Sequence, residues 1–180
     1  MKKWILTLIS IVSIAAAVQA QKIYSTKTAI VSFFSHTPTE DIEAFNNQTI
    51  SKLTDKGLVS FSLLIKGFRF ENELMQEHFN GKDYMESDKF PKAEFKGNVT
   101  NIATVRFDKN GNFPVVVEGN LTIKGITKKV SAKGTISVNN GKVLAKSVFN
   151  IKIKEFGLTG KDIGSIIAND MKITVTSKYD

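Results

Sequence analysis

Apolar and polar side chains alternate along most of this chain. The clearest run places Phe113, Val115, Val117, Leu121 and Ile123 on one face, whereas the residues between them are mostly polar or small. A repeat of two residues is typical of a β-strand with one face buried and the other in water. This segment is therefore predicted to be a strand with one apolar face.

Similar runs predict most of the remaining fold. They lie at residues 30–34, 58–66, 93–99, 130–138, 143–153 and 171–178, with weaker runs at 48–54 and 102–108. Between them, Asp55-Lys56-Gly57, Asn110-Gly111 and Asn139-Asn140-Gly141 offer the positive φ angles that tight hairpins need. Eight or nine strands joined by short turns predict an all-β fold: a single eight-stranded antiparallel barrel, or failing that a sandwich.

Two short helices are predicted to interrupt the strands. Thr37-Pro38-Thr39-Glu40 has the pattern of a helix N-terminus, which predicts a helix from Pro38 to about Phe45. A second helix is predicted over 72–79, where one side carries Leu74, Met75, His78 and Phe79. That side can close the core or act as a lid over the mouth of a barrel. A third, weaker helix is predicted at 161–169.

The N-terminus has the pattern of a secretory signal. Lys2 and Lys3 precede an apolar run from Trp4 to Val18, and small residues follow up to Ala20. The apolar run is shorter than the roughly 20 residues of a membrane-spanning helix. We therefore expect a signal peptide over 1–20, cleavage near Ala20, and one mature domain over 21–180 without an integral membrane anchor. The predicted location is the periplasm or the outside of the cell.

Charge and motifs point away from nucleic acid and from catalysis. Without Lys2 and Lys3 the chain keeps 23 basic against 17 acidic side chains, and its lysines are dispersed along the strands rather than gathered with aromatic residues. Dispersed lysines favour solubility, with weak attraction to anionic head groups as the alternative. The chain has no cysteine, and His36 and His78 are its only histidines. Glu77, His78 and Asp83 could form an acid/base or metal cluster, but structural roles are favoured for both histidines. We expect no enzyme, no nucleic acid and no metal.

The residues alone leave the interior of the barrel open. An eight-stranded barrel is just wide enough to fill itself with side chains or to hold one small ligand. The chain has 13 phenylalanines, several of them within predicted strands. Large apolar side chains could fill the lumen or line a tunnel, and a packed core is the default.

Four segments carry a resemblance to a known family. They are residues 72–79 with Leu74 and His78, residues 87–97 with the run Phe-Pro-Lys-Ala-Glu-Phe, the stretch 119–130, and 149–158 with its Phe156-Gly157 pair. Their order and spacing resemble those of YceI-like proteins over essentially the whole mature chain. The resemblance implies an extended, lipocalin-like barrel whose hydrophobic tunnel holds the tail of a polyisoprenoid, including quinone-type isoprenoids, in the periplasm. Many members carry an Arg-Asp pair shortly before the His-Leu position, which Glu73 to His78 do not match.

Under this resemblance, the inward faces of the best strands and the predicted helix at 72–79 become candidates for ligand binding. They are Val59, Phe61, Leu63, Ile65, Leu74, Phe79, Phe95, Val99, Leu121, Ile123, Phe149, Ile151 and Ile153. The expected partner is an isoprenoid or another long-chain lipid, with a bound isoprenoid lipid or isoprenoid quinone in place of any cofactor. A homodimer is possible because strand edges can pair.

Three hypotheses of function follow, in this order. The first is an exported, non-enzymatic protein that holds a polyisoprenoid or similar amphiphile for transport, storage or stress protection. The second is a packed barrel that serves as a structural or interaction module of the cell envelope. The third is an enzyme that acts on an apolar substrate.

Overall fold

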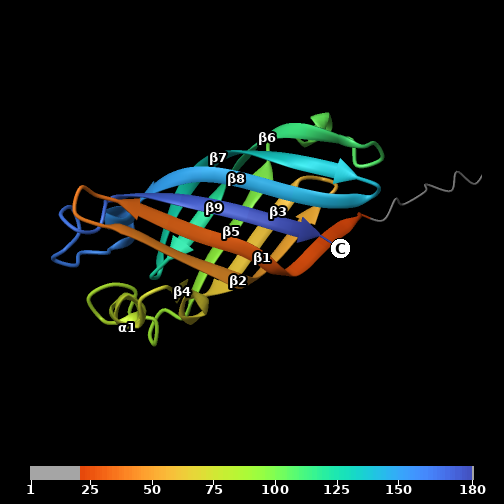
Figure 1. The fold of residues 1–180 in the computed structure, drawn as a ribbon. Coiled ribbons are helices and arrows are strands. Elements are labelled where there is room, and N and C mark those ends of the chain that lie inside the picture. The colour runs from red at the N-terminus through yellow and green to blue at the C-terminus, as the bar shows by residue number, and fades with distance from the viewer. Residues whose placement is uncertain (1–20, 180) are drawn as a thin grey trace, which may run out of the picture.

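The computed structural model describes residues 21–179, and within them the chain forms a closed antiparallel barrel of eight long strands (Figure 1). The strands are β1 (Ile23–His36), β2 (Asp41–Thr54), β3 (Leu58–Leu64), β5 (Lys92–Val99), β6 (Gly111–Ile123), β7 (Ile126–Asn139), β8 (Lys142–Lys152) and β9 (Asp170–Tyr179). A two-residue strand, β4 (Arg69–Phe70), pairs with β2. The barrel closes because β1 pairs with both β2 and β9. The predicted eight-stranded barrel is confirmed. The predicted signal peptide lies outside the described residues.

The two ends of the barrel differ. One end, which we call the loop end, carries the turn at 37–40, the segment 65–91 with helix α1 (Glu73–Asn80), the turn at 124–125 and the segment 153–169 (Figure 1). The opposite end carries two short hairpin turns and the segment 100–110. Irregular segments that can surround an opening are therefore concentrated at the loop end.

Two hairpin turns have the left-handed geometry that favours glycine. Lys124 and Gly125 join β6 to β7 with φ angles of 50° and 76°, and Asn140 and Gly141 join β7 to β8 with 49° and 78°. Positive φ at both central residues matches the right-handed twist of the flanking strands. The turn predicted at 139–141 is confirmed, and register across β6 and β7 runs without a break from Gly111 to Ile123.

The opposite end is closed by a hydrophobic cluster. Tyr24 stacks on Phe107 with 5.0 Å between ring centroids, and Val105 is buried beside them. The prediction of a strand at 102–108 was wrong: the segment contains a short 3-10 helix, η2 (Ile102–Thr104), followed by a turn. The apolar side chains of this segment, Ile102, Val105 and Phe107, pack into the cluster that closes the end of the barrel, and the segment forms no strand of the wall.

Two predicted helices are not helices. Residues 41–45 belong to β2, where Phe33 of β1 pairs with Ala44, so the helix predicted over 38–45 was wrong. The helix predicted at 161–169 was also wrong, because that segment consists of turns and an isolated bridge between Ile163 and Ile167. The strands predicted to reach residues 66 and 153 end earlier: Ile65 and Ile153 begin the 3-10 helices η1 (Ile65–Gly67) and η3 (Ile153–Phe156).

The helix predicted at 72–79 is confirmed as α1. The side chain of Asn72 caps it, since Oδ1 accepts hydrogen bonds from the backbone N–H groups of Leu74 at 2.9 Å and Met75 at 3.3 Å. No side chain of α1 is fully buried, and Phe79 is half-buried. In the described part of the chain, no helix is long and apolar enough to cross a membrane.

Replacement of the cap should loosen α1 alone. We expect Asn72→Ala to destabilise the helix by about 1 kcal/mol, because two N–H groups lose their acceptor. Amide hydrogen exchange at Leu74 and Met75 should then accelerate about fivefold. Asn72→Ser, which restores a capping oxygen, is the matched control. Equal exchange in the alanine and serine variants would contradict the assigned role of this side chain.

Candidate functional site

A cavity of about 500 Å³ lies inside the barrel. All eight long strands contribute to its wall, and so do α1 and the segment 153–169. Space exists because several inward positions carry small residues, notably Ala132 and Gly134 on β7 and Ala145 and Ser147 on β8. The interior is therefore hollow, and its size lies within the usual range of ligand-binding sites.

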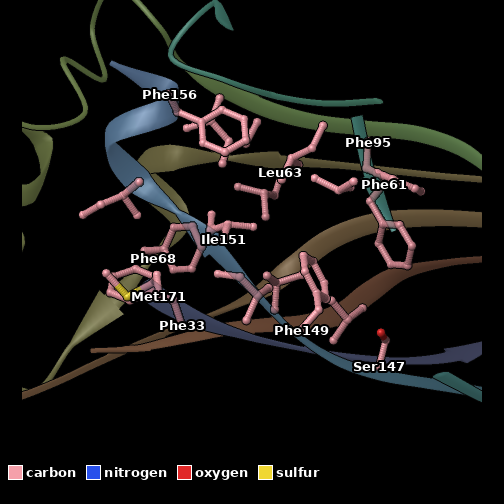
Figure 2. Close-up of a pocket in the computed structure, with 18 of the residues that line it drawn as sticks. Phe33, Phe61, Leu63, Phe68, Phe95, Ser147, Phe149, Ile151, Phe156 and Met171 are labelled. Atoms are coloured by element: carbon pink, nitrogen blue, oxygen red, sulfur yellow. The ribbon is translucent and has the colours of Figure 1, made fainter. Parts of the chain in front are cut away.

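Inward-facing aromatic and aliphatic side chains in the middle of the barrel are only half-buried. Phe61, Phe95, Phe149 and Leu121 retain accessible surface although their strands turn polar residues outward. Their accessible surface faces the cavity, and Figure 2 shows the rings of Phe61, Phe95 and Phe149 pointing toward it. Apolar surface kept open inside a barrel is typical of a site for an apolar ligand.

The structure brings all thirteen of the predicted ligand-binding positions to this cavity. They are Val59, Phe61, Leu63, Ile65, Leu74, Phe79, Phe95, Val99, Leu121, Ile123, Phe149, Ile151 and Ile153. Twelve lie on the barrel wall or close the loop end, whereas Leu74 on α1 is 58% exposed at the rim. Their contact with a ligand remains a prediction.

The sequence analysis missed an aromatic cluster at the loop end. Phe33 of β1, Phe68 and Phe70 surround Phe79, the one aromatic side chain of α1, with ring centroids 5.0 to 5.7 Å apart within the group. Such aromatic pairs contribute roughly 0.5–1.5 kcal/mol each beyond their buried area. Phe79 thereby fastens α1 to the barrel. The spacing Phe68-x-Phe70 was the available signal, but these residues follow the last predicted strand position.

Other wall residues missed by the sequence analysis come from the last strand and the segment before it. Phe156, Met171, Ile173 and Val175 all line the cavity. The alternation of Met171, Ile173 and Val175 within a correctly predicted strand was a usable signal. Phe156 belongs to one of the segments that resemble the family, but the Phe156-Gly157 pair alone does not predict that its side chain lines the cavity.

Polar side chains meet the cavity at its loop end. The hydroxyl group of Tyr84 donates a hydrogen bond to Asp162 Oδ2 at 2.8 Å, and Lys124 Nζ donates to the carbonyl oxygen of Tyr84 at 2.6 Å. Tyr84 and Asp162 both line the cavity, as do Glu40 and His78. Burial raises the pKa of Tyr84 to about 12, and the hydrogen bond and the negative charge of Asp162 add to the rise. Tyr84 is thus protonated at neutral pH.

A second polar group lies toward the opposite end of the barrel. The hydroxyl groups of Tyr179 and Ser51 are 2.8 Å apart, and both residues are buried. Burial raises the pKa of Tyr179, and the hydroxyl groups of Ser51 and Ser177 partly oppose that rise. Tyr179 also lines the cavity.

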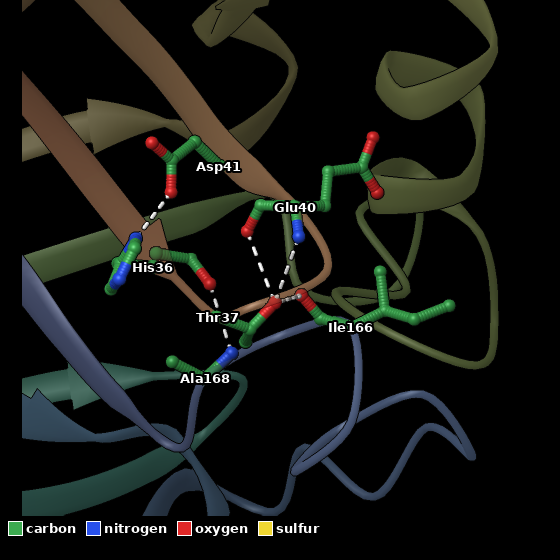
Figure 3. Close-up of polar contacts among 7 residues, drawn as sticks. His36, Thr37, Glu40, Asp41, Ile166 and Ala168 are labelled. Atoms are coloured by element: carbon green, nitrogen blue, oxygen red, sulfur yellow. Dashed lines mark hydrogen bonds and ion pairs between the residues drawn. The ribbon is translucent and has the colours of Figure 1, made fainter.

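The turn at 37–40 is fixed by hydrogen bonds rather than by a helix (Figure 3). Thr37 Oγ1 accepts from the backbone N–H of Glu40 at 3.1 Å and donates to backbone carbonyl groups, including that of Ile166 at 3.2 Å. His36 Nδ1 lies 2.6 Å from Asp41 Oδ1, and both side chains are exposed. His36 therefore stabilises the turn, while the turn itself is tied to the segment 153–169 at the mouth.

Acidic and histidine side chains do not gather into a metal site in the described residues. Within 21–179, no three such side chains come close enough to bind one ion, and Glu77, His78 and Asp83 are included in that statement. His78 is exposed on α1 at the edge of the cavity.

Comparison with protein families identifies the barrel. The model of the YceI-like domain matches residues 16–179. The chain belongs to the YceI-like family. Two UPF0312 proteins, from Shewanella sp. strain W3-18-1 and Shewanella putrefaciens strain CN-32, are each 35% identical over 57 residues, which are 32% of this chain. The matched stretch spans about a quarter (26%) of the length of these curated relatives.

Solved structures of this YceI-like fold agree with the architecture. A polyisoprenoid binding domain from Saccharophagus degradans superposes with a TM-score of 0.75 at 10% identity, covering 88% of this chain and 97% of that one. BcnA of Burkholderia cenocepacia gives 0.66 at 20% identity, covering 82% and 94%. The YceI protein of Campylobacter jejuni gives 0.54 at 15% identity, covering 100% and 99%. At these identities the likeness establishes the fold alone.

Proposed function

We propose that this YceI-like protein binds a polyisoprenoid or a similar long-chain amphiphile in its barrel and carries, stores or protects it without chemical change. The observation that carries this proposal is the cavity of about 500 Å³, whose wall consists mainly of aromatic and aliphatic side chains. The polyisoprenoid-binding neighbour of the same fold supports the choice of ligand class. A fully packed interaction module is disfavoured by the cavity itself.

Burial of hydrocarbon is sufficient to drive such binding. Removing roughly 500 Å² of an apolar tail from water at about 25 cal/mol per Å² provides on the order of 12 kcal/mol before ordering costs. The site therefore needs no covalent or metal chemistry to hold its ligand. An isoprenoid lipid and the tail of an isoprenoid quinone satisfy this requirement equally.

The proposed place of action is outside the cytoplasm. The signal-like sequence before Gln21 would direct export and be removed near Ala20, leaving the barrel in the periplasm or the medium. A shuttle for an insoluble lipid is useful in such an aqueous compartment. The mass of the purified protein in solution would show whether two barrels pair.

Mass spectrometry of an organic extract tests the proposal. Residues 21–180 should be purified from the export compartment without detergent, and the extract should contain a long-chain isoprenoid in an amount comparable to the protein. A cavity-filling variant, Ala132→Trp, purified in parallel should yield little of it. An empty extract, followed by no uptake of isoprenoid alcohols, quinones or phosphates, would overturn the proposal.

A further inference from the structure

Two polar side chains at the mouth of the cavity are held in place from several sides. The hydroxyl group of Tyr84 donates a hydrogen bond to Asp162 Oδ2 at 2.8 Å, although the two residues are 78 positions apart in the sequence. Lys124 donates a hydrogen bond to the backbone carbonyl oxygen of Tyr84. The ring of Tyr84 lies against Gly160, where an added Cβ would come within 2.6 Å of it. These contacts make the pair a built feature of the mouth.

The backbone of Asp162 is fixed as well. Its carbonyl oxygen accepts hydrogen bonds from the N–H groups of Ser165 at 3.2 Å and of Ile166 and Ile167 at 2.9 Å each. These bonds fix the backbone position from which the carboxylate of Asp162 projects. In a pocket that is otherwise apolar, a few such positioned polar groups set the orientation and head-group preference of the ligand.

Carboxylates outnumber the basic side chains that line the mouth, where His78 is the one basic group among the described residues. Asp162 and Glu40 line the loop end of the cavity, and within the described residues no lysine or arginine lines it there. Lys124 keeps its positive charge nearby, but it lies outside the lining, and its ammonium group donates a hydrogen bond to the carbonyl oxygen of Tyr84. The remaining charged lining residues, Glu94 and Lys146, are exposed and alternate with inward-facing neighbours on their strands.

The hydrogen-bonding capacity left at this pair is acceptor capacity. The one O–H group of Tyr84 already donates its hydrogen bond to Asp162. The lone pairs of the phenol oxygen and the second carboxylate oxygen therefore remain as acceptors. A hydroxyl group can donate to either. A phosphate ester carries close to two negative charges near neutral pH and offers acceptors only, so it would meet the carboxylates with repulsion.

We propose that Tyr84 and Asp162 form a head-group subsite that accepts a hydrogen bond from a hydroxyl group and excludes a phosphate ester. The ligand of the barrel is then an isoprenoid alcohol, or an amphiphile with a similar neutral, hydrogen-bond-donating head. This inference rests on the proposed function, because it assumes that an apolar chain occupies the cavity.

Two probes with the same chain test it: geranylgeraniol and geranylgeranyl phosphate. Their affinities for delipidated residues 21–180 should be measured by titration at about 0.15 M ionic strength. The alcohol should bind at least about tenfold more tightly than the phosphate. Added salt should strengthen binding of the phosphate, because salt screens the repulsion between charges. The uncharged alcohol has no such repulsion to screen, so its affinity should not rise for this reason.

Matched variants locate the effect. Asp162→Asn keeps the shape of the side chain and an acceptor oxygen. In this variant the ratio of the affinity for the alcohol to that for the phosphate should fall several-fold. Asp83→Asn removes the same charge from an exposed neighbour outside the cavity lining, and the preference should persist. A phosphate that binds as tightly as the alcohol, or a preference unchanged in Asp162→Asn, would overturn the inference while the proposed function stands. If neither probe binds, both fail together.

Discussion

Ala132→Trp should reduce the affinity for geranylgeraniol by a factor of about 150. Ala132 is half-buried on the inner face of β7 and lines the cavity, so an indole ring placed there projects into the space reserved for the ligand. If the ring displaces roughly four methylene groups of the chain at about 0.8 kcal/mol each, the loss is about 3 kcal/mol. Titration with the alcohol measures it directly.

The neighbouring residue on the same strand is the matched control. Ser131 is exposed and pairs with Glu118 on the outer face of the barrel. Ser131→Trp adds the same ring to the outside, and we expect its affinity to stay within about twofold of the unmodified protein. Equal affinity in both tryptophan variants would mean that the ligand does not enter the barrel at this depth.

The walls of the cavity could be predicted from the sequence because alternation records which face of a strand is buried. Phe61 and Phe95, Leu121 and Phe149 were placed correctly toward the interior on that basis. Alternation does not report how much space is left between opposite walls, since that depends on which small residues face one another across the barrel. The hollow interior itself could therefore be known only from the structure, although the family resemblance favoured it.

The mouth could not be predicted in the same way. Tyr84 and Asp162 lie in irregular segments without periodicity, and only the fold brings them within hydrogen-bond distance. A sequence pattern describes neighbours along the chain, whereas these two residues are positioned by contacts with Lys124 and Gly160. Head-group recognition thus depends on residues that sequence reasoning is least able to find.

The incorrect helix at 38–45 shows how a correct local signal can be overruled. Thr37 does accept the hydrogen bond from Glu40 that such a helix start requires. The chain nevertheless continues as β2, because Ala44 and Asn46 are almost completely buried there and pair with β1. A strand with partners on both sides satisfies more backbone groups than two isolated helical turns, which are marginal in water.

Helix α1 differs because its local signal meets no competing strand. Its cap is formed by Asn72, and its single deep attachment is Phe79 among the aromatic rings. Leu74 and His78 stay exposed along the rim of the cavity. An element with so few buried contacts belongs to the least stable part of a fold. Helix α1 is therefore held at the mouth mainly by the contacts of Phe79.

Gly119→Ala is expected to destabilise the barrel by about 3 kcal/mol, which lowers the melting temperature of a chain of this size by about 10 °C. Gly119 on β6 pairs with Gly97 on β5. A Cβ at position 119 would lie 2.5 Å from the Cα of Gly97 and 2.5 Å from the carbonyl oxygen of Lys96. Both obstacles are backbone atoms, so the two strands would have to separate.

The same substitution should also reach the cavity. The ring of Phe95 lies over this glycine pair, with its Cζ atom 2.7 Å from the position of the added Cβ. The ring is the one side chain among these obstacles, so we expect it to shift into the lumen, where it would take space from the ligand. Gly111→Ala on the same strand is the control, since its nearest obstacle is a side-chain ring, that of Phe113, at 3.1 Å. Thermal unfolding and alcohol titration of the two variants should separate clearly, and identical melting temperatures would show that the glycine pair does not set the spacing of β5 and β6.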